Sequence, residues 1–495
     1  MKESNQTSDV DRVSSSSGRR KFLKFAGAAG LATSLAGCGG SDTNTTTTTD
    51  GSNGGGSGGQ DTTTSDNPDD ISGVNFEYWD VHHSQSEAAR QSVQGLVEEF
   101  ESGTGANLRV NYDSVGNSAG SKWINAFQRG DYPNIITGFS HIDGKYMDGG
   151  WIKPFSEYKD NFSQETLDGI EWILPVIEHA SRMYDEGIMG IPFGFEPKNP
   201  FIARIDHFEE AGLDPEEDFP PKNYEHLIEV ATTLQEDGPG EYGFQIWGTA
   251  SDWLEVSNPM AIALGGTDGA FLNEAADDTN IDNDTWVQNI KNWSEIYTKH
   301  GLSSGGTVNA NDETAVALMR QGELSMTQVA PANHPSFMEQ ARDMMMDGTL
   351  QWGPMYNEPS GQRGTFLLAT MAITRKPEQT SQEEWAPKER AAVQFVEKLL
   401  SKDFQRSLQQ NYGYLPVRDD VWDDASDQVE GEDSHHFSES LFTMAEEIDV
   451  AWSFHPKQRP AMVSPTPHMQ KVLQGDLTPE QACKDAAEEF RNTIL

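Results

Sequence analysis

The sequence contains few cysteines, few basic residues and no long apolar segment. Its 495 residues include two cysteines, Cys38 and Cys483, which are too few for a disulfide framework. The sequence has no run of about 18 apolar residues, the minimum for a membrane-spanning helix. Lysine and arginine number 35 against 79 aspartates and glutamates, for a formal net charge of -44. Such a surface repels phosphate backbones, so nucleic-acid binding is disfavoured.

Recognisable catalytic and metal-binding motifs are also missing. There is no G-x-S-x-G elbow, P-loop, G-x-G-x-x-G or H-E-x-x-H pattern. The pairs His82–His83 and His435–His436 lack the i,i+4 spacing and the cysteine company of a zinc motif. We therefore predict no metal, no cofactor and no catalytic residue.

The acidity is spread over the whole chain. Even the block that includes Asp419, Asp420, Asp423 and Asp424 is better explained by a solvated surface than by a cation site. Repulsion between such charges is screened at high ionic strength, and the composition resembles the proteomes of salt-loving archaea. With 12 Trp, 12 Tyr and 23 Phe, the chain has enough aromatic residues to fold and is not an acidic disordered protein.

The first 38 residues have the order of an export signal. The stretch SSSSGRRKFLKFAGAAGLATSLAGC combines paired Arg19 and Arg20 with a short uncharged run that ends at Cys38. The arginine pair resembles a twin-arginine signal, and LAGC resembles a lipobox, in which the cysteine receives a lipid. We therefore expect residues 1–37 to be removed and Cys38 to anchor the protein to the outer face of the cell membrane. The alternative is an arbitrary basic and apolar start with a chance cysteine.

A tether is predicted directly after the anchor. Residues 38–70 consist almost entirely of Gly, Ser, Thr, Asp and Asn, and contain no large apolar side chain. Such a segment cannot bury enough surface to become ordered, so it would act as a flexible spacer.

The remaining residues 71–495 are too many for a single core and predict two lobes. Expected strands at 75–79, 108–112 and 134–140 alternate with amphipathic helices, which indicates parallel βαβ units. The pattern resumes with strands at 241–247, 323–330 and 366–373 and a long helix at 389–408. Cys483 lies in a helical-looking stretch, where a small buried residue is favoured over a reactive thiol.

Eight motifs in this order resemble an extracellular solute-binding protein family of the sugar-binding type, related to maltose-binding protein. They cover essentially all of residues 71–495 and read EEFESGTGANLRVNY, FQRGDYPNIITGFS, MDGGWIKPF, GIMGIPFGFEPKNPFIARIDHFEEAGLDP, NPMAIALGG, MRQGELSMTQVAPANH, QNYGYLPVRDDVW and LTPEQACKDAAEEFRNTIL. The chain departs from the family pattern at Arg204, Ile205 and at Ala332–His334, where the family often has an aromatic residue.

The resemblance implies an α/β, type II two-lobe fold with the ligand in a cleft between the lobes. Three hinge crossings are expected near 195–200, 355–361 and 400–404. Lobe 1 would comprise 71–195 and 362–400, and lobe 2 would comprise 200–355 and 405–495. The resemblance also implies a monomer that is not an enzyme and that hands a sugar or oligosaccharide to the permease of an ABC importer.

Candidate ligand contacts are aromatic and polar residues near the ends of the expected strands, because sugars present apolar faces for stacking and hydroxyl groups for hydrogen bonding. The predicted binding residues are Trp79, Asp80, His82, Phe139, His141, Glu196, Trp247, Asp252, Trp253, Asn333 and Phe366. Within this set, Trp79, Trp253 and Phe366 are predicted stacking platforms, and Asp80, Glu196 and Asp252 are predicted hydroxyl acceptors.

Two alternatives remain open from the sequence. A secreted glycosidase would use paired carboxylates beside aromatic residues, although chance pairs are common among so many carboxylates. The same fold could instead carry glycerol phosphate, a polyamine or iron, and the shortage of basic residues at the strand ends argues against an anionic ligand.

Overall fold

A computed structural model describes residues 70–83, 86–113, 117–181, 184, 187–249, 253–311, 313–422, 424, 434–448, 450–451 and 455–495. The chain divides into two compact units, Met1–Asp70 and Ile71–Leu495, and the fold described below is that of the second unit. The expected signal peptide, Cys38 and all of the tether except Asp70 lie outside the described residues.

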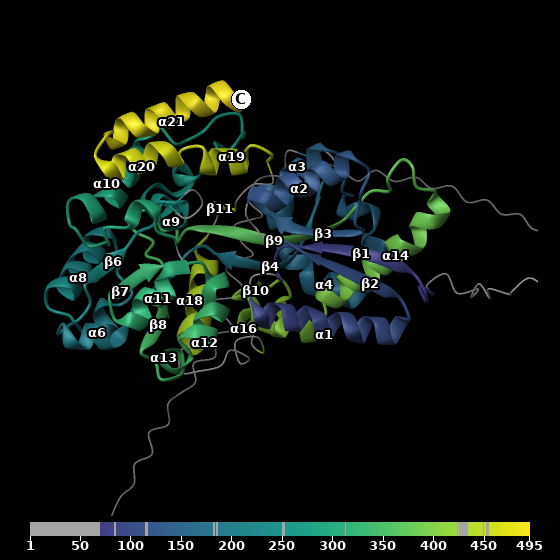
Figure 1. Ribbon diagram of the computed structural model, residues 1–495, viewed down its shortest axis with the longest axis horizontal. Helices are drawn as coiled ribbons and strands as arrows, with labels where there is room; N and C mark the ends of the chain where they lie inside the picture. Colours follow the sequence, from purple (N-terminus) through teal and green to yellow (C-terminus); the bar gives the residue numbers. More distant parts are fainter. Residues whose placement is uncertain are drawn as a thin grey trace, which may run out of the picture. The chain divides into compact units, whose positions relative to one another are not determined.

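The larger sheet has seven strands in the order β10-β4-β9-β3-β1-β2, with β11 joined to β9. They are β1 (Asn75–Asp80), β2 (Asn107–Tyr112), β3 (Ile135–Phe139), β4 (Ile191–Pro197), β9 (Thr365–Ile373), β10 (Leu415–Pro416) and β11 (Val450–Ala451). β1 runs parallel to β2 and β3, whereas β9 runs antiparallel to β3 and β4. The sheet is therefore mixed, and the expected parallel units account for its β2-β1-β3 part (Figure 1).

Strand β9 lies in the middle of this sheet, and all nine of its residues are buried. Its sequence, TFLLATMAI, shows no alternation of polar and apolar residues. A strand covered on both faces has this continuous apolar character, since neither face meets water.

Helix α1 (Glu87–Thr104) shows how the chain sets the ends of these elements. The hydroxyl oxygen of Ser86 accepts a hydrogen bond from the backbone N–H of Ala89, which caps the first turn. Gly105 has φ 73° and ends the helix in the left-handed conformation that glycine adopts most easily. Between these caps, Val93 and Phe100 are buried on one face, as their spacing predicts.

The smaller sheet has four strands in the order β6-β7-β5-β8. They are β5 (Phe201–Arg204), β6 (Tyr242–Gln245), β7 (Leu324–Gln328) and β8 (Leu350–Gly353). β6 and β7 are parallel, and β5 is antiparallel to β7 and β8. Beside this sheet, a buried cluster of Trp253, Trp286 and Trp293 forms part of the hydrophobic core.

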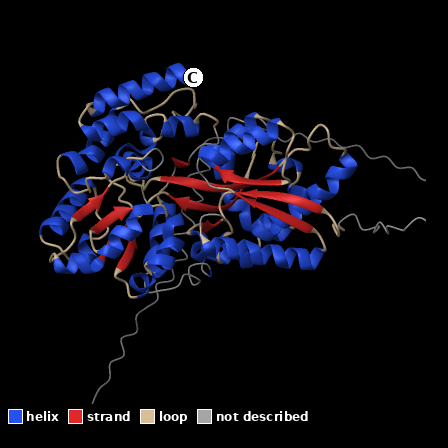
Figure 2. Cartoon of the chain, viewed as in Figure 1, coloured by secondary structure: helices blue, strands red, loops and turns tan. Residues whose placement is uncertain are grey.

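Helices lie on both sides of the strands (Figure 2). Up to α10, the helices are α2 (Asn117–Gln128), α3 (Ser140–Asp148), α4 (Gln164–Ile170), α5 (Leu174–Ala180), α6 (Ile205–Glu210), α7 (Pro215–Asp218), α8 (Tyr224–Glu236), α9 (Trp253–Gly265) and α10 (Asp284–Thr298). They continue with α11 (Glu313–Gln321), α12 (His334–Gln340), α13 (Arg342–Met346), α14 (Gln382–Leu399), α15 (Lys402–Arg406), α16 (Leu408–Tyr412), α18 (Ser434–Glu446), α19 (Gln458–Val463), α20 (Thr466–Gln474) and α21 (Pro479–Thr493). Among the described residues, every helix is too short or too polar to traverse a bilayer.

The chain passes between the two sheets close to two of the expected crossings. Residues 198–200 join β4 to β5, and residues 354–364 join β8 to β9. After residue 404, however, the chain stays with the larger sheet, because β10 pairs antiparallel with β4. β11 likewise pairs with β9. The structure therefore differs from the expected third crossing at 400–404, and the range expected for lobe 2 contributes two strands to the larger sheet.

Candidate functional site

Two buried charges lie where the chain passes from the larger to the smaller sheet. The Nζ atom of Lys198 is 2.7 Å from Oε1 of Glu196, and the two side chains are 3% and 2% exposed. The Oε2 atom of Glu196 accepts a 3.3 Å hydrogen bond from the backbone N–H of Ala332. Ala332 belongs to the short 3-10 helix η7 (Pro331–Asn333), which follows β7. The Glu196 carboxylate therefore connects a strand of the larger sheet to a turn of the smaller-sheet region.

The next residue of the crossing carries unsatisfied polar atoms. Asn199 is fully buried with φ 56°, and neither Oδ1 nor Nδ2 of its side chain has a hydrogen-bond partner among the described residues. Its carbonyl accepts a 3.0 Å bond from Nε2 of Gln328, whose own Oε1 also has no partner. Unpaired buried amides are costly and rare in native proteins.

Asp80 lies at the end of β1 and is fully buried. Its Oδ1 accepts hydrogen bonds from the hydroxyls of Tyr78 at 2.9 Å and Thr137 at 3.0 Å, and from the backbone N–H of His82 at 3.3 Å. Its Oδ2 accepts a 2.7 Å bond from the backbone N–H of His83, whose Nδ1 lies 2.6 Å from Oδ1. Protein donors therefore occupy the predicted hydroxyl acceptor, and its role in binding stays a prediction.

Electrostatics keep the Asp80 carboxyl ionised. Burial raises its pKa, but the adjacent imidazole of His83, by charge and by hydrogen bonding, outweighs this effect and lowers the pKa to about 2. For His82, burial lowers the pKa to about 4, despite the opposing attraction of Asp80. The end of β1 therefore holds a fixed negative charge on Asp80, and the imidazole of His82 is neutral near pH 7.

Aromatic rings surround the two histidines. His82 lies edge-on to Phe193 at a centroid distance of 4.9 Å, and its imidazole is 2.7 Å from the carbonyl oxygen of Gly138. His83 is 5.1 Å from the ring of Tyr412, again edge-on. This packing holds His82 inside the protein beside the larger sheet, and its predicted role in ligand binding stays a prediction.

Asn333, which ends η7, is partly exposed and lies directly after the Ala332 amide that Glu196 holds. The neighbouring His334 is fully buried, and its ring stacks on Phe437 at 4.0 Å. Within the part of the chain that the structure describes, neither ring nitrogen of His334 has a hydrogen-bond partner. Asn333 therefore follows directly after the amide that hydrogen-bonds to Glu196 of β4, and its role in binding stays a prediction.

The three remaining buried candidates pack inside the protein. Trp253 is fully buried, and its indole N–H donates a 3.1 Å bond to the hydroxyl of Thr466. Trp247 is also fully buried and donates a 3.2 Å bond to the carbonyl of Gln328. Phe366 is 3% exposed, and its ring lies edge-on to that of Phe195. To stack on a sugar, each ring would have to leave these contacts, and the three predicted roles stay predictions.

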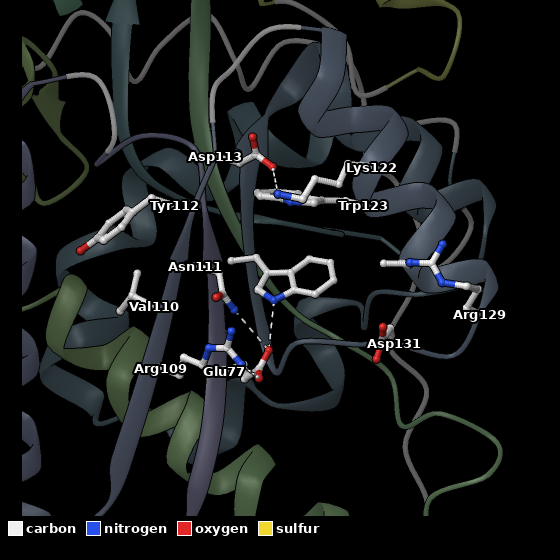
Figure 3. Close-up of a pocket in the computed structure, with 12 residues that line it drawn as sticks. Glu77, Arg109, Val110, Asn111, Tyr112, Asp113, Lys122, Trp123, Arg129 and Asp131 are labelled. Carbon is white, nitrogen blue, oxygen red and sulfur yellow. Dashed lines mark hydrogen bonds and ion pairs between the residues drawn. The ribbon is translucent and has the colours of Figure 1, made fainter.

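Trp79, the remaining predicted platform, lines a cavity of about 600 Å³ between β1, β2 and α2. We name this space the edge cavity, because β2 is the terminal strand of the larger sheet. Its lining consists of Glu77, Trp79, Arg109, Val110, Asn111, Tyr112, Asp113, Lys122, Trp123, Ala126, Arg129 and Asp131. Figure 3 shows Glu77, Asn111 and Arg109 at one end of this space, with Asp113, Lys122 and Trp123 at the other.

Four of the named positions cannot be placed with their side chains. Asp252 and Cys38 lie outside the described residues. Phe139 ends β3 and His141 lies in α3, but nothing is described of their side chains. Their expected roles stay predictions.

Sequence reasoning missed Lys198, Asn199 and Gln328. The signal that was present is the EPKNP stretch, in which a lysine and an asparagine lie between two prolines at an expected crossing. Glu196 lies two positions before Lys198 in this stretch, so an ion pair between these two side chains would have been the natural hypothesis.

Comparison with known proteins places this architecture in a class. The model of the family described as bacterial extracellular solute-binding protein matches residues 84–406, more than half of the chain. The chain therefore belongs to the family of bacterial extracellular solute-binding proteins, and the resemblance inferred from the sequence motifs is confirmed. No curated protein matches the chain.

Solved structures agree on the fold. One is an ABC transporter solute-binding protein from Thermotoga lettingae bound to alpha-D-tagatose, with 18% identity, a TM-score of 0.67, and coverage of 85% of this chain and 99% of that one. A cyclic alpha-maltosyl-1,6-maltose binding protein from Arthrobacter globiformis has 15% identity, a TM-score of 0.65 and coverage of 85% and 98%. A maltose-bound protein of T. maritima has 17% identity, a TM-score of 0.63 and coverage of 85% and 100%. The predicted type II fold is confirmed.

Proposed function

We propose that this protein is the substrate-binding component of an ABC importer and that it carries a sugar or oligosaccharide to a membrane permease. The family match supports extracellular solute binding. The similar structures named above were solved with tagatose or maltose, or are named for an oligosaccharide ligand, which supports a sugar as cargo. We propose that the protein returns its ligand unchanged, as a carrier and not an enzyme.

The arrangement of Glu196 is the observation that carries this proposal. It lies at the crossing, has its cation Lys198 within 2.7 Å, and reaches the backbone of Ala332 in the smaller-sheet region. A side chain that contacts both sheet regions keeps all of its contacts only while the two regions are close together. We propose that a sugar hydroxyl competes for the long Ala332 bond and that Asn333 adds a second polar contact.

Closure of the two lobes couples binding to delivery. We propose lobe 1 as 71–195 with 362–400, and lobe 2 as 200–355 with 405–495, except that β10 and β11 belong with the larger sheet. A ligand held by both lobes binds the closed form more tightly and shifts the population toward it. The permease would then recognise the closed, loaded monomer.

We also propose that the protein works on the outer face of the membrane, attached through a lipid on Cys38. The twin-arginine pattern would address it to export, and residues 38–70 would give the folded part reach. Mass spectrometry of the native protein should show a mature chain that begins at lipid-modified Cys38. A mature N-terminus at any other residue would rule out this anchor.

A thermal-shift screen of monosaccharides and oligosaccharides in high salt tests the cargo, followed by calorimetry on each hit. We expect one saccharide to raise the melting temperature and to make the particle more compact in solution scattering. Asn333→Ala should weaken its binding, whereas Asn75→Ala, at the exposed start of β1, should leave it unchanged. Binding of a polyamine or a phosphate ester in preference to every sugar, or turnover of the bound sugar, would contradict the proposal.

A further inference from the structure

The edge cavity differs from the rest of this acidic protein in its charge. Its described lining holds three acidic residues, Glu77, Asp113 and Asp131, and three basic residues, Arg109, Lys122 and Arg129. The whole chain carries 79 acidic residues against 35 basic ones. A balanced lining in such a chain presents donors and acceptors in equal measure, without attracting ions of one sign.

Two other cavities show the contrast. A cavity of about 820 Å³ beside β8 and α18 has Glu209, Asp214, Glu216 and Glu439 in its lining, and no lysine or arginine among the described residues that line it. A cavity of about 280 Å³ beside α8 has Glu225 and Glu358 as its charged lining residues. Both follow the composition of the chain, whereas the edge cavity departs from it.

The edge cavity also has an aromatic wall whose orientation is fixed. The indole N–H of Trp79 donates a 3.2 Å hydrogen bond to Oε2 of Glu77, and the Trp79 ring packs 5.7 Å from the ring of Trp123. Phe127 lies behind, 5.9 Å from Trp79. Trp123 is buried, but Trp79 is partly exposed. A ring held in place before binding costs a ligand little ordering entropy.

One carboxylate organises the polar groups on this wall. Glu77 accepts hydrogen bonds from Nδ2 of Asn111 and from the guanidinium of Arg109, both at 3.3 Å, in addition to the bond from Trp79. Residues 77 and 79 lie on the same face of β1, because alternate residues of a strand share a face. Their register partners on β2 are residues 109 and 111. Aromatic, amide and charged groups therefore converge on one side of the sheet.

The space itself follows from the position of β2 and from a short side chain on α2. Among the described strands, β2 has β1 as its one neighbour, so the cavity lies at the edge of the sheet. Ala126 lines the cavity on the helix side, where a longer side chain would fill it. A volume of about 600 Å³ is within the range of pockets that hold small organic ligands, roughly 300–1,000 Å³.

We propose that the edge cavity is a second binding site, for a neutral saccharide of one or two rings. An indole face suits the apolar face of a sugar ring, and the surrounding amide, guanidinium and carboxylate groups suit its hydroxyls. The balanced charge favours an uncharged ligand. None of the lining residues belongs to a crossing or to the smaller sheet. This site therefore does not depend on the site proposed at Glu196, and the two can fill separately.

The experiment uses the full chain with tryptophan labelled on its indole nitrogen, and follows the NMR signals of Trp79 and Trp123 during titration with glucose, maltose and trehalose. Spermidine serves as a cationic comparison. Asn111→Trp places a bulky side chain into the cavity. Asn107→Trp is the matched control, because Asn107 lies on the same strand and face, is exposed, and does not line the cavity.

We expect at least one of the three sugars to shift both indole signals saturably. Asn111→Trp should weaken this response by about tenfold or more, since a bulky ring occupies the place of the sugar. Asn107→Trp should leave it unchanged, and both variants should keep any tighter binding that calorimetry detects elsewhere. Asn111→Leu removes the amide without filling the cavity, and it should weaken the response if Asn111→Trp does not fold.

Three results would overturn the proposal. The first is that the signals of Trp79 and Trp123 do not move with any of the three sugars. The second is that they move as strongly in Asn111→Trp as in the native chain. The third is that spermidine shifts them at lower concentration than every sugar. Each result is separate from sugar binding at the crossing, which calorimetry measures on the same samples.

Discussion

Removing the charge of Lys198 at the crossing should lower the free energy of unfolding more than removing the charge of any exposed lysine. The perturbation is Lys198→Met, which keeps the length of the side chain and deletes its charge. At 2.7 Å from Glu196, the attraction between the charges is about 6 kcal/mol at an effective dielectric constant of about 20. The cost of removing both charges from water offsets most of this attraction in the native protein, but the variant loses the cation that lies 2.7 Å from this buried carboxylate. We therefore expect a loss of about 3–5 kcal/mol in the free energy of unfolding.

The assay is denaturant unfolding at moderate and at high salt, with Lys398→Met as the matched control. Lys398 pairs with Glu99 at 3.0 Å, but the two side chains are 45% and 68% exposed, so its loss should cost about 1 kcal/mol or less. Salt should shrink the effect of the control and leave that of Lys198→Met nearly unchanged, because buried pairs are poorly screened.

The double variant Glu196→Gln with Lys198→Met isolates the pair. Gln keeps an acceptor for the Ala332 amide but carries no charge, so the double variant should be more stable than Lys198→Met by about 2 kcal/mol. Equal losses for Lys198→Met and Lys398→Met, or additive losses in the double variant, would refute the argument from burial.

Three further predictions concern other parts of the fold. Burial lowers the pKa of His334 from 6.5 to about 3. Below pH 6.5 the unfolded chain therefore binds a proton at this imidazole while the folded chain does not, and the free energy of unfolding falls as the pH drops. His334→Phe should remove about 2 kcal/mol of the stability loss between pH 6.5 and 5, measured by urea unfolding. Gly169→Ala should destabilise by about 1–3 kcal/mol, despite the better helix propensity of alanine, because its Cβ would lie 2.7 Å from the buried Arg418 guanidinium; an unchanged melting temperature would contradict this. Cys483 is fully buried, and burial raises its pKa to about 12, so in a Cys38→Ser chain its reaction with a disulfide reagent should proceed no faster than unfolding.

Much of the fold was predictable because hydrophobic periodicity is a local signal. The expected strand at 75–79 is β1, and the one at 366–373 is β9 within one residue. Strand direction was not predictable, because the continuous apolar run of β9 fits parallel and antiparallel neighbours equally. The helix expected at 389–408 begins at 382 and ends at 399, since the Ser381 cap and the Ser401 cap of α15 define two helices.

The candidate site was less predictable, since burial depends on the whole chain. Trp79 and Trp253 are both aromatic residues at expected strand or loop ends, yet Trp79 lines a cavity and Trp253 is surrounded by other tryptophans. Glu196 was selected as an acceptor, but its partner Lys198 was not, because the pairing depends on the turn between two prolines. The extra strand β10 was missed because two residues carry no periodicity.

The position of β9 has a consequence for the order in which the chain can fold. β3 and β4 do not pair with each other, and β9 lies between them with hydrogen bonds to both. While the ribosome is still synthesising the smaller sheet, β9 has not yet been made, so β3 and β4 each have an unpaired edge. Exposed edges of this kind invite wrong pairing. Any chaperone that guards this protein during synthesis must therefore protect it until residue 373 has emerged.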